Sequence, residues 1–172
     1  RRSSDLQNNR LLMGEDRVGF TRILASDGGA FSTLVDLPGF GGFTVDPATN
    51  NIYTNVTGNV TIYDQNGGLL NGSFASLADG AGMAFGPGNS LWGNDLYAMV
   101  SSTGELVRID SLGNTTVIGT GFESTTYGPT FGPDGYMYFS VFNQDKIIRI
   151  VPEPSALALL ALGGLAVLRR RG

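Results

Sequence analysis

The sequence contains no cysteine and no histidine. Without cysteine the chain can form no disulfide, no thiolate nucleophile and no cysteine-ligated zinc site. The absence of histidine also excludes the usual Ser-His-Asp triad and histidine-based acid–base catalysis. We therefore expect no catalytic residues, no metal site and no cofactor.

Charged residues are few, at 15% of the 172 residues, and the formal net charge is −4. Lysine occurs once, at Lys146, and three of the eleven basic residues are the consecutive Arg169, Arg170 and Arg171. The chain before those arginines is therefore more acidic than the net charge suggests. Because an acidic surface repels a phosphate backbone, we expect no nucleic-acid partner.

Glycine is abundant, with 26 of the 172 residues, and 41% of the residues are hydrophobic. That hydrophobic content is sufficient for a packed core, so the composition does not indicate disorder. Short runs of β-branched and aromatic residues alternate with turns rich in Gly, Pro and Asn. These features predict an all-β protein.

Three segments repeat one pattern. Each has a short strand that begins at a glycine, a Pro/Gly/Asn turn, a strand containing tyrosine, a second turn and an alternating strand. The opening glycines, Gly42, Gly82 and Gly128, are 40 and 46 residues apart. Periods of this length are typical of solenoids, propellers and arrays, and four antiparallel strands in ~40–45 residues are typical of a β-propeller blade.

The ends of the repeat are incomplete. Segments 10–15, 18–25 and 30–36 are expected to form strands two to four of an earlier blade, with its first strand missing. The last unit is expected to stop after its third strand, so residues 1–150 should form a partial propeller of about three and a half blades, with fourteen strands in all. The alternative is one β-sandwich, which also has short strands at regular spacing.

The units, which open as Gly82-Met83-Ala84-Phe85-Gly86-Pro87 does, resemble the NHL-like and gluconolactonase-like β-propellers over about residues 10–151. Most such propellers are binding scaffolds, and some are sugar-lactone hydrolases with a divalent metal held by Glu, Asn and Asp near the central axis. That ligand set cannot be matched here residue by residue. We therefore expect a non-catalytic scaffold that binds glycan or protein. The alternative is a metal-dependent sugar-lactone hydrolase completed by upstream blades.

Two further sets of side chains are candidates for ligand contact. Aromatic side chains could form a sugar-binding platform or simply pack the sheets: Trp92, Tyr97, Tyr127 and Tyr136. Aspartates at strand ends could offer oxygen ligands to Ca²⁺ or hydrogen-bond their own turns, and we favour the turns: Asp46, Asp64, Asp95, Asp110, Asp134 and Asp145.

The last 22 residues have a different character. Val151-Pro152-Glu153-Pro154 must stay extended, because proline does not fit inside a helix. Residues 155–168 are uncharged and predict a helix of about 21 Å, shorter than the ~30 Å hydrocarbon core of a bilayer. A buried soluble helix is the alternative, but Arg169, Arg170 and Arg171 favour a membrane segment that ends at the cytoplasmic interface.

This three-part pattern resembles the PEP-CTERM sorting signal of Gram-negative bacteria and covers residues 151–172. The resemblance implies an exosortase, an integral-membrane cysteine protease, that recognises Pro152-Glu153-Pro154 and releases the body. It also implies a transmembrane helix at 155–168, a body first in the periplasm and then at the cell surface or in the medium, and exopolysaccharide as a further partner.

The N-terminal residues also bear on this expectation. Arg1-Arg2-Ser3-Ser4-Asp5-Leu6-Gln7 contains neither an initiator methionine nor the apolar segment of a signal peptide. Because a protein with a surface-sorting tail must cross a membrane, we expect an export signal and further blades upstream.

Overall fold

The computed structural model describes residues 2–6, 10–17, 20–26, 29–38, 41–56, 58–78, 80–89, 91–124, 126–142 and 144–151. Fifteen β-strands lie in these residues, in four antiparallel sheets. The first sheet contains β1 (Arg2–Leu6), β2 (Arg10–Arg17), β3 (Phe20–Ser26) and β4 (Ser32–Pro38). The second contains β5 (Gly42–Val45), β6 (Ile52–Val56), β7 (Asn59–Tyr63) and β8 (Leu69–Ser76).

The other two sheets continue the same meander. The third contains β9 (Gly80–Phe85), β10 (Leu96–Val100), β11 (Glu105–Ile109) and β12 (Thr115–Gly119). The fourth has three strands, β13 (Thr126–Phe131), β14 (Met137–Val141) and β15 (Lys146–Ile150). In every sheet the spatial order follows the chain, so each strand pairs with its neighbour in sequence.

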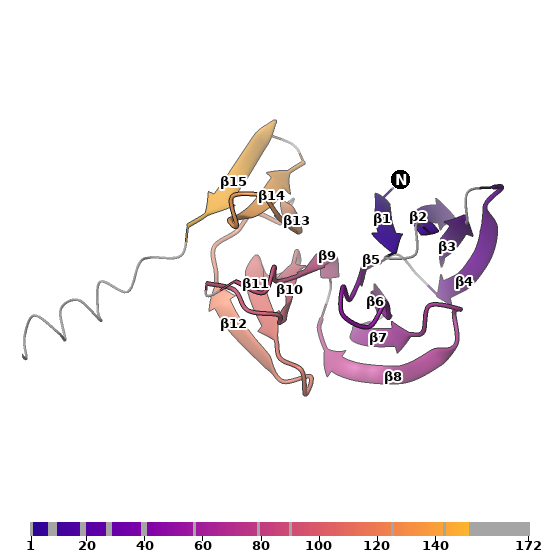
Figure 1. Ribbon diagram of the computed structural model, residues 1–172. Coiled ribbons are helices and arrows are strands. Elements are labelled where there is room, and N and C mark those ends of the chain that lie inside the picture. The colour runs from indigo at the N-terminus through magenta and orange to yellow at the C-terminus, as the bar shows by residue number, and fades with distance from the viewer. Residues whose placement is uncertain are drawn as a thin grey trace, which may run out of the picture.

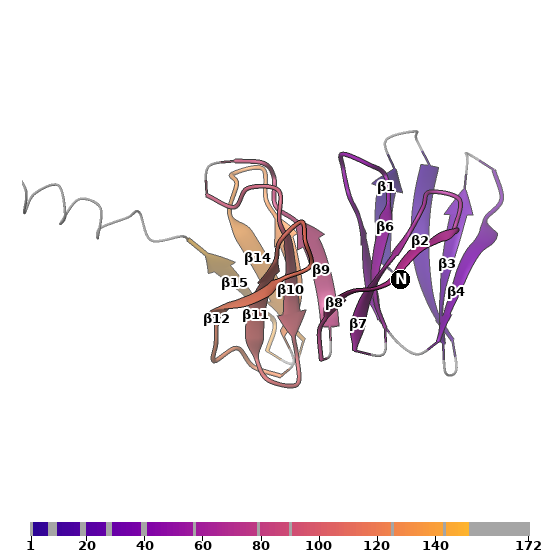
Figure 2. The ribbon, with the colours of Figure 1, turned by 90° about the horizontal axis from the view of Figure 1, so that it is seen from below.

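The four sheets form an arc. Figure 1 shows β1, β5, β9 and β13 on its inner side and β4, β8, β12 and β15 on its outer side. The inner strands contact one another, with β9 next to both β5 and β13. In the perpendicular view the connecting turns gather at the two ends of the sheets (Figure 2). This is the blade arrangement of a partial β-propeller, which confirms the predicted fold class over a sandwich.

The repeat glycines Gly42, Gly82 and Gly128 lie in the inner strands β5, β9 and β13, as the sequence predicted. Of the three, Gly42 alone begins its strand, because β9 starts at Gly80 and β13 at Thr126. An ideal Cβ on Gly82 would lie 2.8 Å from the backbone oxygen of Gly128 in the next sheet. The glycine therefore lets neighbouring inner strands approach closely around the axis.

One expectation about the first sheet was wrong. Its innermost strand is present as β1, which pairs with β2 from Arg2 opposite Gly14 to Leu6 opposite Arg10. The sequence of β1 lacks the apolar alternation by which strands are recognised. The pairing is nevertheless possible because ladder hydrogen bonds come from the backbone, whatever the side chains are.

Among the described residues the core forms three clusters, one between each pair of neighbouring sheets. The central strand β10 shows how they form, because all five of its residues are buried. Leu96, Ala98 and Val100 pack towards the second sheet, whereas Tyr97 and Met99 pack towards the fourth. A strand that is covered on both faces needs a continuous hydrophobic run, and this explains why all five residues of β10 are aliphatic, aromatic or methionine.

Candidate functional site

The concave side of the arc contains a hollow of about 620 Å³. Its walls come from inner strands β5, β9 and β13 and from the end of β14, so it lies where the sheets converge. The lining residues are Phe43, Thr44, Gly82, Met83, Ala84, Tyr127, Gly128, Pro129, Thr130, Ser140 and Phe142. None of them is charged, although the chain as a whole is acidic.

Two aromatic rings form one wall of this hollow. Tyr127 and Phe142 make an edge-to-face pair with their centroids 6.1 Å apart. Phe142 is 74% exposed and Tyr127 is 37% exposed, so both rings offer surface to a ligand. Thr44, Thr130 and Ser140, whose side chains carry hydroxyl groups, belong to the same lining. Such a surface can stack on an apolar ring face and hydrogen-bond to a polar ligand.

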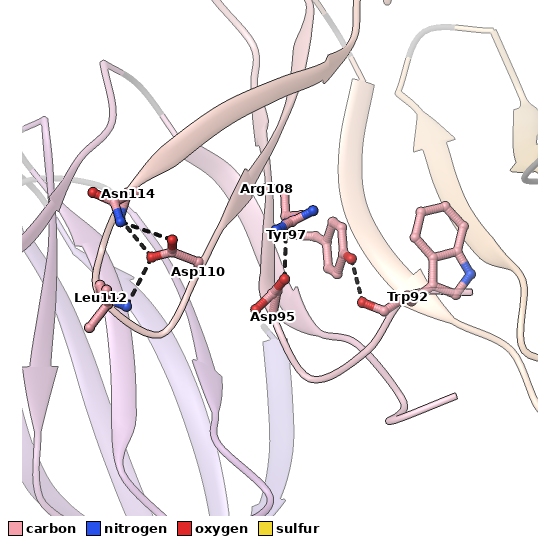
Figure 3. A network of polar contacts seen from close by, with 7 residues as sticks. All are labelled: Trp92, Asp95, Tyr97, Arg108, Asp110, Leu112 and Asn114. Carbon is pink, nitrogen blue, oxygen red and sulfur yellow. Dashed lines mark hydrogen bonds and ion pairs between the residues drawn. The ribbon is translucent and has the colours of Figure 1, made fainter. Parts of the chain in front are cut away.

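The four candidate aromatic residues do not form one platform. Trp92 and Tyr97 are buried, with 8% and 3% of their surface exposed, and they pack edge to face with each other and with Phe131. The Trp92 indole Nε1 donates to the carbonyl of Gly135 at 2.9 Å. The Tyr97 hydroxyl donates to the Trp92 carbonyl at 2.5 Å, as Figure 3 shows. The sheet-packing alternative is therefore confirmed for these two residues.

The remaining aromatic candidates have different surroundings. Tyr136 lies under the guanidinium of Arg149, whose Cζ is 5.2 Å from the ring centroid. Of the four residues, Tyr127 alone lines the concave hollow, where its partner is Phe142. Sequence reasoning missed Phe142. The alternation of β14 could have indicated this residue. Met137, Phe139 and Val141 face the core, and Phe142 follows the strand in a turn.

A second hollow of about 620 Å³ lies between the second and third sheets, among the turns at one end of the strands. Three of the candidate aspartates line it, namely Asp46, Asp95 and Asp110. Asp46 accepts the backbone N–H of Ala48 at 2.8 Å, and Asp95 pairs with Arg108 at 2.9 Å. These carboxylates therefore already have partners within the protein.

Asp110 shows the turn role most fully (Figure 3). Its Oδ1 accepts the backbone N–H groups of Leu112 and Asn114, both at 2.9 Å, and its Oδ2 accepts the Asn114 side-chain amide at 2.9 Å. These hydrogen bonds, led by the one from the Asn114 side chain, hold the pKa of Asp110 below its usual range. Over the described ranges, no three His, Cys, Asp or Glu side chains are grouped so that they could hold a metal ion.

The proposed sorting residues lie almost entirely beyond the described part of the chain. Val151 follows β15 directly and is 47% exposed. Pro152, Glu153, Pro154, the expected helix at 155–168 and the arginine cluster fall outside the described residues. Within the part that the structure describes, no helix has the length and hydrophobicity needed to cross a membrane.

The solved structures with a similar arc include virginiamycin B lyase-type β-propellers. One is a selenomethionine-substituted virginiamycin B lyase from Staphylococcus aureus, which is 14% identical with a TM-score of 0.61. The match covers 90% of this chain and 56% of the lyase chain. A streptogramin B lyase is 16% identical with a TM-score of 0.60, over 90% of this chain and 55% of its own. This chain thus spans little more than half the length of those proteins, and at such identity the likeness shows the fold alone.

The fold therefore places the body among the β-propellers. The chain matches none of the curated proteins in sequence. Residues 151–171, however, match the PEP-CTERM protein-sorting motif, as the sequence predicted. That motif implies export and processing by an exosortase, a membrane protease.

Proposed function

We propose that the propeller is exported, held at the inner membrane by its tail with the body in the periplasm, and released to the cell surface or medium. An exosortase would cut the chain near Pro152-Glu153-Pro154, with residues 155–168 in the bilayer and Arg169, Arg170 and Arg171 at the cytoplasmic interface. The observation that carries the proposal is the position of the motif. It begins at residue 151, and β15 ends at Ile150, so the signal follows the folded body directly.

The release step is tested by fractionating a Gram-negative host with and without an active exosortase. With the enzyme, the tagged body is expected in the medium or outer fraction, smaller than the precursor by about the tail. Without it, the full-length chain is expected in the inner-membrane fraction. A body of one size in one fraction under both conditions would contradict the proposal.

We further propose that the body binds rather than catalyses, and that its ligand is an uncharged glycan held in the concave hollow. The exposed rings of Tyr127 and Phe142 can stack on the apolar face of a sugar ring, and the hydroxyls of Thr44, Thr130 and Ser140 suit its polar rim. The uncharged lining favours a neutral ligand. A protein ligand is the alternative for the same scaffold.

Two observations favour binding over catalysis. One similar structure is a catalytically inactive histidine-to-alanine variant of the virginiamycin B lyase with quinupristin, 12% identical with a TM-score of 0.59, over 90% of this chain and 56% of its own. This chain contains no histidine at all. For the alternative lactone hydrolase, the described residues offer no group of three His, Cys, Asp or Glu side chains that could hold a metal ion.

The glycan hypothesis predicts a large effect from removing the aromatic pair. Each ring is worth about 1 kcal/mol in such contacts, so Tyr127→Ala with Phe142→Ala should weaken binding roughly tenfold or more. Affinity electrophoresis of the released body against the exopolysaccharide of its host measures this change. The matched control is Phe31→Ala, which removes another aromatic ring that is 41% exposed and does not line the hollow. Equal retardation of the double variant and the parent would remove the hollow as the glycan site.

A further inference from the structure

The strand that leads into the sorting motif is unlike its counterparts in the other sheets. The third strands β3, β7 and β11 each pair on both edges, because a fourth strand follows them. β15 is also a third strand, but in the described structure it pairs only with β14, from Met137 opposite Ile150 to Val141 opposite Lys146. Among the described residues, no strand pairs with the outer row of backbone N–H and C=O groups of β15.

β15 is also held weakly by its side chains. Ile147 is 74% exposed, and Ile148 and Ile150 are only partly buried against the third core cluster. In β11, by comparison, Leu106, Val107 and Ile109 are all buried. The charged contacts of β15 are exposed as well, since Lys146 lies 3.7 Å from Glu123 in a pair that is about half exposed on both sides. Segments with few buried apolar contacts open locally at low free-energy cost.

The motif itself offers few backbone hydrogen-bond donors to a protease. An extended peptide is commonly recognised through main-chain hydrogen bonds, with side chains read in alternation. Pro152 and Pro154 have no N–H, so Glu153 is the single donor in Pro152-Glu153-Pro154. Upstream of Pro152 one residue, Val151, separates the motif from the paired strand. Further main-chain contacts on that side must come from residues that β15 contains.

We infer that β15 detaches from β14 in the precursor, and that residues 146–151 form the extended peptide that the membrane protease binds upstream of Pro152. This inference rests on the proposed release by an exosortase and adds a recognition segment to it. Before it detaches, that segment is paired in the fourth sheet as β15. The protease binds the strand through its backbone N–H and C=O groups. Those on the outer edge have no partner strand among the described residues, and those on the inner edge become free when β15 leaves β14.

A disulfide across β14 and β15 tests the inference in the full-length precursor. Ser140 and Ile147 are directly opposite, both are exposed, and the chain contains no other cysteine that could mispair. Opposed Cα atoms in antiparallel strands are about 4.5–5.5 Å apart, within the range that a disulfide spans. We expect Ser140→Cys with Ile147→Cys to slow cleavage about tenfold or more in the oxidising periplasm, and reductant to restore it.

Two further variants separate detachment from other causes. The control disulfide, Arg108→Cys with Thr116→Cys, joins exposed opposed residues of β11 and β12 and should leave cleavage unchanged. A Gly-Ser linker of about six residues, inserted between Ile150 and Val151 of the stapled precursor, should restore cleavage because it supplies free extended chain. Cleavage of the stapled precursor at the parent rate, or no rescue by the linker, would overturn the inference while the release proposal stands. A parent chain that is not cut at all would overturn both.

Discussion

Changing Pro152, Glu153 and Pro154 together to alanine is expected to leave the full-length chain in the membrane fraction, with no released body. Two prolines within three residues are expected to keep the peptide extended, because each lacks an N–H and clashes with a preceding helical turn. Three alanines have the highest helix propensity and would let the helix expected at 155–168 extend towards the sheet. The variant therefore removes both the recognised side chains and the extended backbone, while the hydrophobic anchor is unchanged.

The complementary variant replaces residues 155–168 with a soluble linker and keeps Pro152-Glu153-Pro154. Its precursor has no segment that can hold it at the membrane, so it should escape processing and appear at full size in a soluble fraction. The uncleaved triple-alanine chain is thus expected in the membrane fraction, and the uncleaved linker chain is expected in a soluble fraction. The size and fractionation of the tagged body distinguish them. If the triple-alanine chain were still trimmed and reached the medium like the parent, the tail would be an anchor alone and the sorting interpretation would be wrong.

The order of strands could be predicted because each unit carries its own local signals. Gly42, Gly82 and Gly128 lie in inner strands, where Gly82 comes close to the next sheet, and turn residues mark the hairpins. The innermost strand of the first sheet was missed because Arg2-Ser3-Ser4-Asp5-Leu6 has no hydrophobic alternation, and backbone pairing leaves no trace in side-chain composition.

The binding surface was harder to predict than the fold. Trp92 and Phe142 are both large aromatic residues in or beside turns, yet 8% of the first and 74% of the second is exposed. The difference arises because Trp92 lies in the core cluster between the third and fourth sheets, whereas Phe142 lies at the lining of the concave hollow. That difference depends on how the blades curve around the axis, and one strand's sequence does not encode that curvature.

A different contact between blades also depends on glycine. The hairpin loops after Asp64 in the second sheet and Asp110 in the third have the same design, since each carboxylate accepts two backbone N–H groups of its own loop. Gly113, three residues after Asp110, has a φ of 84°, and an ideal Cβ there would lie 2.1 Å from the backbone oxygen of Phe74. Phe74 is in β8, so the loop of one sheet rests on the outer strand of the sheet before it.

Gly113→Ala should therefore lower the free energy of unfolding by more than the cost of a left-handed backbone alone. That cost, about 1–2 kcal/mol, is measured by the control Gly121→Ala, because Gly121 has a φ of 82° and nothing within 4 Å of its ideal Cβ. A second control, Gly72→Ala, has neither the positive φ nor a close neighbour and should change stability little. Urea denaturation followed by the fluorescence of Trp92, the single tryptophan, reports all three variants.

The comparison is decisive because the three glycines separate the two physical causes. A backbone carbonyl cannot move aside without shifting β8, so the clash at Gly113 must separate the second and third sheets or distort the loop. We expect Gly113→Ala to cost several kcal/mol, about twice the effect of Gly121→Ala or more. If the two variants unfolded at the same urea concentration, the loop would accommodate the added methyl group without further loss of stability. The packing of the Asp110 loop on β8 would then contribute nothing to holding the blades together.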